Sequence, residues 1–165
     1  MRSLARLIAV AAVLGGAFWL WTVLFPSPEK IIRRNLATVA RDVSFQPNEG
    51  PLAIAARTQA LAARFSTNVE VNLNVPERIQ HTFVGRDEIV QAAGGARSGV
   101  SALTVEFLDI NLVVAQDKQS ATASLVVRAD AAGDKDALMQ AMKFSFQKIG
   151  SDWLIDRVET LRTFN

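Results

Sequence analysis

The side chain best suited to acid–base chemistry is His81, the one histidine in the chain. An imidazole titrates close to neutral pH, so it can accept or donate a proton under physiological conditions. His81 falls between a predicted strand and a predicted helix, and its neighbours Gln80 and Thr82 are polar. The same setting is typical of a histidine on the surface or at the edge of a sheet. His81 is therefore a candidate general base, with an ordinary surface position as the alternative.

A second candidate centre surrounds Asp109, which lies where the alternation of residues 103–114 changes phase. Four further polar residues on neighbouring strands could converge with it in a pocket: Glu106, Asn111, Arg128 and Asp130. The alternation of polar and apolar residues also fits a simpler placement, on the solvent-facing side of a sheet. His81 and Asp109 are the two residues on which an enzymatic hypothesis would rest.

Composition excludes several kinds of chemistry. The chain has no cysteine, which removes disulfides, thiol nucleophiles, iron–sulfur clusters and cysteine-rich zinc sites. A lone histidine with scattered acids lacks the spacing of a metal site. No phosphate-binding glycine loop, nucleotide fingerprint or serine nucleophile motif is present. We therefore predict neither a metal nor a cofactor.

The formal net charge of +2 belongs to the N-terminal segment, because Arg2 and Arg6 are the charged residues among the first 25. The remaining chain is neutral. Proteins that bind nucleic acid usually carry a basic stripe. The sequence therefore does not predict a nucleic-acid partner, despite its basic pI of about 9.4.

Residues 7–25 form an uncharged, apolar run. As a helix, this run would reach about 28 Å, close to the hydrocarbon thickness of a bilayer. Trp19 and Trp21 lie near its outer end, where amphipathic rings favour the membrane interface. Pro26 and Pro28 would end the helix. We predict a transmembrane signal anchor over residues 1–26 and one domain over residues 27–165.

A cleaved signal peptide is the alternative, with Met1–Arg6 as its basic part and the small residues 15–17 as a cleavage site. The protein would then be secreted. The most apolar stretch, residues 18–25, lies beyond that site and favours an uncleaved anchor.

The predicted location is a bacterial inner membrane, with the domain facing the periplasm. Arg2 and Arg6 favour a cytoplasmic N-terminus. Three basic residues follow the apolar run and favour the opposite orientation: Lys30, Arg33 and Arg34. A short N-terminal tail before the span, with a folded domain after it, is however typical of a signal anchor, so we expect the domain outside the cytoplasm. These three residues are also candidates to contact anionic headgroups.

Helices are predicted in the first half of the domain. Ser27, Pro28 and Glu29 form a helix start, and an apolar stripe with four- and three-residue spacing continues it to about Ser44. A second helix is expected from Pro51 to about Phe65, and a third after Gly85, weakened by Gly94 and Gly95.

Strands fill the rest of the domain. Residues 69–75 alternate and predict a half-buried strand, with a second short strand over residues 78–84. Three long strands, over residues 103–114, 121–127 and 138–146, are joined by short turns and predict an antiparallel meander. A last strand is expected over residues 153–164. The phase slip near Leu108 and Asp109 indicates a β-bulge. The predicted class is α+β, with a strongly curved mixed or antiparallel sheet covered by three helices.

This order of elements resembles the nuclear-transport-factor-2-like superfamily, the cystatin-like, cone-shaped fold shared by ketosteroid isomerases and SnoaL-type polyketide cyclases. Three local sequences carry the resemblance: residues 61–65 before the first strand, residues 83–89 before the third helix, and residues 150–155 at the last hairpin. They are structural signals, and such a fold by itself implies no particular activity.

The resemblance implies specific groups for an isomerase, and this chain lacks two of them. The first strand ends in Asn74, Val75 and Pro76, with no carboxylate, and the chain has no tyrosine. We therefore expect a non-catalytic, membrane-tethered module that binds a protein partner or forms a homodimer. The alternative is a small-molecule-binding protein or an isomerase- or cyclase-like enzyme that uses the cavity of the cone.

The anchor prediction has a direct test. We expect the chain to stay in the membrane fraction with its N-terminus intact, because the apolar run is long enough to span the bilayer. N-terminal sequencing of the membrane fraction checks this, and a terminus near Ala17 would contradict it. Protease protection in intact cells checks the predicted side of the membrane.

Overall fold

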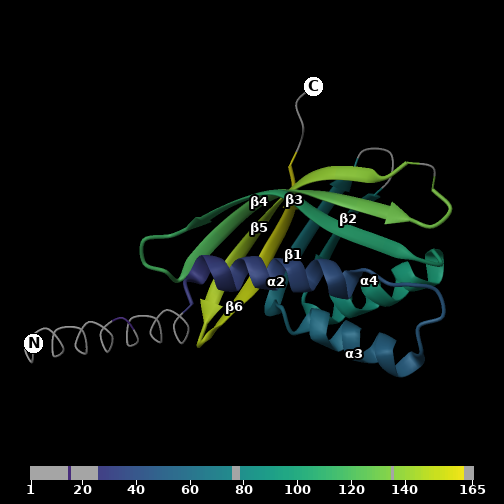
Figure 1. The fold of residues 1–165 in the computed structure, drawn as a ribbon, viewed down its shortest axis with the longest axis horizontal. Helices are drawn as coiled ribbons and strands as arrows, with labels where there is room; N and C mark the ends of the chain where they lie inside the picture. Colours follow the sequence, from purple (N-terminus) through teal and green to yellow (C-terminus); the bar gives the residue numbers. More distant parts are fainter. Residues whose placement is uncertain (1–14, 16–25, 76–78, 135, 162–165) are drawn as a thin grey trace, which may run out of the picture.

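A computed structural model describes residues 15, 26–75, 79–134 and 136–161, which form three helices and six strands (Figure 1). The helices are α2 (Pro28–Val43), α3 (Pro51–Ala62) and α4 (Arg86–Gly99). The strands are β1 (Phe65–Val75), β2 (Ile79–Val84), β3 (Leu103–Val114), β4 (Ser120–Ala131), β5 (Leu138–Ile149) and β6 (Asp152–Thr160). The predicted α+β class is confirmed.

The strands form one mixed sheet in the order β2-β1-β6-β5-β4-β3. Strands β3 to β6 are consecutive antiparallel neighbours. The first and last strands, β1 and β6, run parallel to each other and join the β1–β2 hairpin to the meander. The sheet therefore cannot form from local hairpins alone, because the β1–β6 pairing links two strands that are far apart in the sequence.

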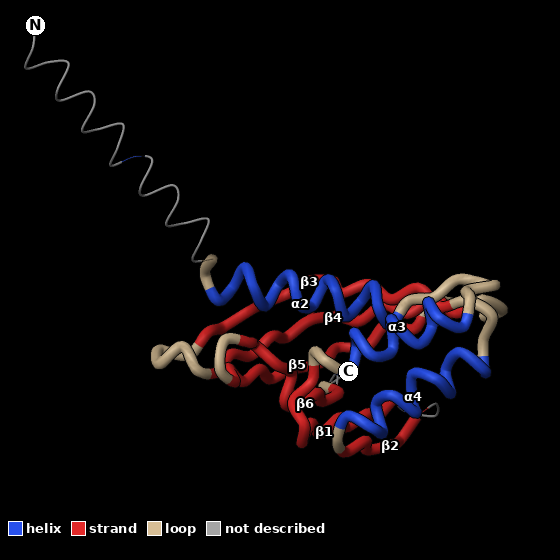
Figure 2. Tube along the Cα trace, turned by 90° about the horizontal axis from the view of Figure 1, so that it is seen from below, coloured by secondary structure: helices blue, strands red, loops and turns tan. Residues whose placement is uncertain are grey.

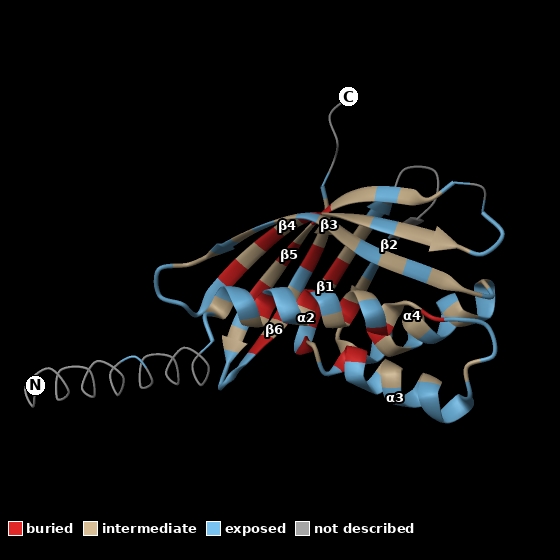
Figure 3. Ribbon diagram, in the orientation of Figure 1, coloured by how far each residue is buried: buried red, intermediate tan, exposed pale blue. Residues whose placement is uncertain are grey.

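Helix α2 lies against the inner face of the sheet (Figures 1 and 2). The Ser27 hydroxyl accepts the Lys30 backbone N–H at 3.4 Å and caps the helix start. Ile32 and Leu36 are 0% exposed, and Val39 continues their stripe. Figure 3 shows this buried stripe facing the buried residues of the strands. The residues that recur at four- and three-residue spacing in the sequence are therefore the ones through which α2 contacts the core.

The predicted β-bulge is present in β3. The register between β3 and β4 shifts between Leu108 and Asn111. Asp109 adopts a positive φ of 51°, in the left-handed region that disfavours most side chains. A bulge bends a strand, and here it lets the inner face of β3 follow α2 on both sides of the phase change.

The end of α3 differs from the sequence prediction. Helix α3 ends at Ala62, because Phe65 already belongs to β1 and pairs with Ile155 of β6. Helix α4 continues through Gly94 and Gly95 to Gly99. Each glycine costs a helix about 1 kcal/mol relative to alanine, and tertiary contacts of Arg97 in the last turn offset this cost.

Glycine is required at the start of α4. Gly85 has a φ of 85°, and its N–H bonds to the Val69 carbonyl at 2.7 Å. Glu88 then accepts the Val84 backbone N–H at 2.7 Å and closes the first turn of α4. Residues 83–89, which carry part of the family resemblance, therefore form the turn before α4 and its N-terminal cap.

In the part of the chain that the structure describes, no helix is both long enough and apolar enough to cross a membrane. The predicted anchor falls almost entirely on residues 1–14 and 16–25, which lie outside the described residues.

The bulge makes a stability prediction. A β-branched residue in the left-handed conformation is strained, so D109V should lower the free energy of unfolding by about 1–2 kcal/mol. D109G should not destabilise the protein, because glycine adopts this conformation freely. Urea unfolding followed by far-UV circular dichroism measures both.

The control is N111V, two residues further along β3, where the backbone carries no positive φ. Valine suits a strand there, so N111V should leave the midpoint nearly unchanged. Equal losses for D109V and N111V would contradict the strain at Asp109.

Candidate functional site

His81 lies on β2, directly opposite Leu73 of β1, and its ring is 4.4 Å from the ring of Phe83. Two shallow hollows border it, with volumes of about 350 Å³ and 330 Å³. The first is lined by Asn72, Leu73, Asn74, His81 and Thr82. Its lining comes from neighbouring positions on two strands, so successive side chains point to opposite sides of the hairpin.

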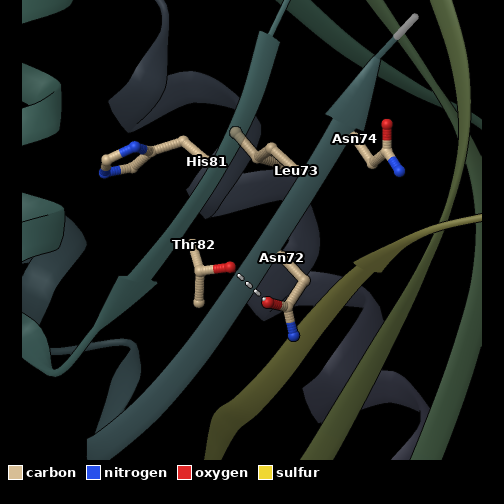
Figure 4. A pocket seen from close by; sticks show the side chains of 5 residues that line it. All are labelled: Asn72, Leu73, Asn74, His81 and Thr82. Carbon is tan, nitrogen blue, oxygen red and sulfur yellow. Dashed lines mark hydrogen bonds between the residues drawn. The ribbon is translucent and has the colours of Figure 1, made fainter.

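Figure 4 shows the consequence. Thr82 donates a hydrogen bond to Asn72 at 2.8 Å, and the imidazole points away from this pair. The carboxylate bordering the second hollow is Glu88, which already accepts the Val84 N–H. The side chain of His81 is exposed, and its imidazole takes part in none of the side-chain hydrogen bonds among the described residues. The described residues therefore give His81 no acid to orient it.

The fold brings together only some of the five polar residues of the second candidate centre, which are Asp109 and its four neighbours. Arg128 forms ion pairs with Glu106 at 3.7 Å and with Asp130 at 3.1 Å. All three side chains are about half exposed, and such surface pairs contribute little to stability. Asn111 lies opposite Ser124, further along the strand, and Asp109 is exposed at the bulge. A pocket built from the five stays a prediction.

The three basic residues near the predicted anchor lie in the first half of α2. Lys30, Arg33 and Arg34 are all exposed, on the side of the helix away from Ile32 and Leu36. Contact of these three residues with headgroups stays a prediction as well.

The most buried charged cluster is one that sequence analysis did not find. Glu49 follows α2 and accepts hydrogen bonds from Arg57 of α3 at 2.6 Å and from Arg97 of α4 at 2.8 Å. The side chains of Glu49 and Arg97 are only 11% and 10% exposed. Arg97 also stacks on Phe45, 4.8 Å from the ring centre. One carboxylate thus joins the three helices.

Burial acts to raise the pKa of Glu49, but the opposing contacts prevail. The hydrogen bond from Arg97, the backbone N–H of Gln46 and the positive charges of Arg57 and Arg97 all favour the carboxylate, and its pKa lies below the ordinary value. Beside this cluster is a hollow of about 140 Å³, lined in part by Phe45, Asn48 and Ile54. Its small volume suits a structural ion pair better than a binding site.

No local signal could have revealed this cluster. Arg97 stands 48 residues after Glu49 along the chain, and Arg57 stands 8 residues after it. The three residues meet only because α3 and α4 pack beside each other.

The outer face of the sheet, opposite the helices, carries mostly polar side chains. Arg157 of β6 pairs with Glu70 of β1 at 2.9 Å and with Glu159 at 3.4 Å. Cross-strand pairing is the role that the sequence suggests for Arg157 and Glu159.

An apolar row crosses the same outer face. Leu108 pairs with Val126, and Val126 pairs with Ala141. The N–H of Leu161 donates to the Ala141 carbonyl at 2.8 Å and extends the row past the end of β6. Their neighbours Leu125 and Met142 are buried against the core, so alternation turns Val126 and Ala141 outward. Met139, opposite Arg128, borders the row and is 59% exposed.

Metal chemistry has no centre in the described residues. Across residues 26–75, 79–134 and 136–161, no three histidine or acidic side chains lie close enough together to hold an ion.

Comparison with known proteins finds the fold and no sequence family. No protein-family profile and no curated protein sequence matches the chain. Solved structures do match. A domain of unknown function with a cystatin-like fold from Nostoc punctiforme aligns with a TM-score of 0.64 at 16% identity, over 86% of this chain and 80% of its own.

Two structures from Novosphingobium aromaticivorans are also similar. A nuclear-transport-factor-2-like protein with a cystatin-like fold has a TM-score of 0.59 at 19% identity, covering 89% of this chain and 86% of its own. A chain with a provisional scytalone dehydratase assignment has a TM-score of 0.62 at 16% identity, covering 82% and 84%. The protein has the nuclear-transport-factor-2-like, cystatin-like fold. At these identities the likeness extends to the fold alone.

The Glu49 cluster gives a pH-dependent prediction. A carboxylate whose pKa is lowered by folding stabilises the protein above its unfolded pKa of about 4.3. That stabilisation is lost as the pH falls through the folded value. E49Q should therefore lower the melting temperature at neutral pH, and the difference from the wild type should shrink below about pH 4. Thermal melts from neutral to acidic pH measure it.

The matched control is E106Q, which removes a carboxylate from an exposed ion pair. Its melting temperature should follow the wild type across the whole pH range. An E49Q deficit that persists unchanged in acid would show that the ionised Glu49 is not what stabilises the helices.

Proposed function

We propose that this protein is a non-catalytic assembly module, tethered to a bacterial inner membrane by its N-terminal segment, with its domain in the periplasm. The module binds a protein partner, either a second copy of itself or another membrane-associated protein. The observation that carries the proposal is the apolar row on the outer sheet face, formed by Leu108, Val126, Ala141 and Leu161 and bordered by Met139.

The position of the row supports this role. A sheet with one face covered by helices usually has polar residues on its open face. Here one apolar row lies beside a polar row, which is formed by Asn111, Ser124, Lys143 and Glu159. An apolar centre with a charged and polar rim is the usual composition of a protein–protein contact.

The surroundings of the catalytic candidates also support a binding role. A general base needs a partner or a substrate site that holds it in place. His81 is exposed beside open hollows, and the nearest lining carboxylate is used as a helix cap. Asp109 lies at a backbone bulge, and the neighbouring Glu106 and Asp130 pair with Arg128.

The alternative function is binding or conversion of a small molecule. The hollows beside His81, at about 350 Å³ and 330 Å³, are in the size range of ligand pockets. A structural neighbour with a provisional dehydratase assignment is consistent with it. The two functions separate in one experiment, because a ligand-binding protein needs no neighbour at the apolar row.

Crosslinking in the native membrane tests the assembly role. The chain has no cysteine, so M139C places a single thiol at the border of the row. We expect a short maleimide–benzophenone linker, which couples to the thiol and on illumination inserts into a neighbouring C–H bond, to join M139C to a neighbouring protein in one discrete product, identified by mass spectrometry. Adding V126K should abolish the product, because an interface that buries an unpaired lysine is strongly destabilised.

The control thiol is L52C on α3, at an apolar residue that is more exposed than Met139 but far from the row. It should give several-fold less product. If M139C and L52C crosslink equally, or M139C yields no product, the apolar row is not a contact surface. Circular dichroism of the V126K variant distinguishes a lost contact from a lost fold.

A further inference from the structure

Three segments meet at one end of the domain, which we call the anchor-side end. They are the first turns of α2, the turn between β3 and β4 (residues 115–119) and the turn between β5 and β6 together with its flanking residues (148–152). Figure 1 shows all three at the left of the molecule, where α2 begins.

Backbone contacts fix this arrangement. Phe45, two residues after α2, exchanges hydrogen bonds of 2.8 Å and 3.0 Å with Leu103 at the start of β3. Helix α2 therefore runs antiparallel to β3, and its first turns lie toward the far end of that strand. The Lys148 N–H donates to Gln119 at 2.8 Å, which holds the two turns side by side. Asn35 of α2 donates to the Trp153 carbonyl at 3.0 Å and joins the helix to the second turn.

The anchor-side end has an excess of positive charge. Its acidic residues are Glu29, Asp117 and Asp152. Its basic residues are Lys30, Arg33, Arg34, Lys118 and Lys148. Within the described part of the chain, none of these five basic residues forms an ion pair. The turn at the other end of β4, residues 132–137, has the opposite sign, with Asp134 and Asp136 around Lys135.

An apolar side chain stands at the tip of the same end. Ile149 closes β5 just before the turn and is 48% exposed. Isoleucine beside Lys148 and Lys118 is the composition of a segment that touches a headgroup layer, with its apolar part inserted and its charges at the phosphates.

The connection to the predicted span is short. If the span ends at Phe25, two residues separate it from α2, and this connection is at most about 11 Å long. The electrostatic screening length is about 8 Å at physiological salt. The connection is therefore less than two screening lengths long, which keeps the start of α2 within the surface potential of an anionic membrane.

We propose that the anchor-side end rests on the membrane surface, with Ile149 in the headgroup layer and the basic residues of both turns and of α2 facing anionic headgroups. The proposal rests on the tether proposed above and adds an orientation to it. In this orientation β5 and β6 rise from the membrane, and the apolar row faces sideways toward neighbouring membrane proteins. Each basic residue near such a surface contributes about a five-fold preference for contact.

Depth-dependent quenching tests the orientation in the full chain. Single thiols at the two opposite turns, I149C and D134C, are labelled with the fluorophore NBD, and the chain is reconstituted into phosphatidylcholine vesicles with or without phosphatidylglycerol. Lipids with a nitroxide on the headgroup act as quencher. We expect several-fold stronger quenching for I149C than for D134C, with a further increase in phosphatidylglycerol. K118Q/K148Q should remove most of that increase.

The outcomes are separable. If the chain is lost from the vesicles on alkaline extraction, the tether is wrong, and the orientation falls with it. If the chain is retained and both labels are quenched equally, only the orientation is overturned. If I149C is strongly quenched but the quenching depends neither on phosphatidylglycerol nor on K118Q/K148Q, the role of the basic residues is overturned and the orientation alone is retained.

Discussion

The packing of α2 beneath the curved sheet is the contact on which the other features depend. Ile32, Leu36 and Val39 lie between the helix and the strands, and each fully buried aliphatic side chain stabilises the fold by about 1.5–3 kcal/mol. A flat sheet could not cover this stripe along its whole length. The bulge at Asp109 supplies the bend in β3, the strand with the most extensive contact with α2. The bulge therefore bends the sheet so that it covers the apolar stripe of α2.

The same packing separates the domain into two ends with different roles. At one end, the charge cluster of Glu49, Arg57 and Arg97 joins the loop after α2 to α3 and α4. Removing one member would leave a largely buried charge without its partner, which is strongly destabilising. At the other end, the start of α2 and two hairpin turns project exposed basic residues and Ile149. The first end is stabilised by ion pairs within the domain, whereas the charged side chains at the second end are exposed to solvent.

The two proposals assign complementary tasks to the remaining surfaces. The anchor-side end would fix the height and orientation of the domain above the membrane. The outer sheet face would then be presented sideways, where its apolar row can meet a neighbour. Confinement to a membrane would raise the effective concentration of both partners, so that even a modest apolar row would support assembly. A diffusing enzyme would have no need of either arrangement.

The sequence by itself determined the local features, because each depends on neighbouring residues. The Ser27 cap, the α2 stripe, the meander and the bulge near Asp109 all follow from periodicity and turn chemistry, and the structure confirms them. The resemblance of element order also predicted the cystatin-like fold that the structural neighbours share. The limits of local signals appear at α4, where two glycines predict a weak end and a contact of Arg97 with Glu49 stabilises the last turn.

Only the tertiary structure decided which distant residues meet. The parallel pairing of β1 with β6, the cluster around Glu49 and the apolar row each combine segments far apart in the chain. Hydrophobic alternation says that a residue faces outward but not which outward residues of other strands lie beside it, since that is set by register. For the same reason His81 and Asp109 could be nominated from their side-chain chemistry alone, while their surroundings came from the fold.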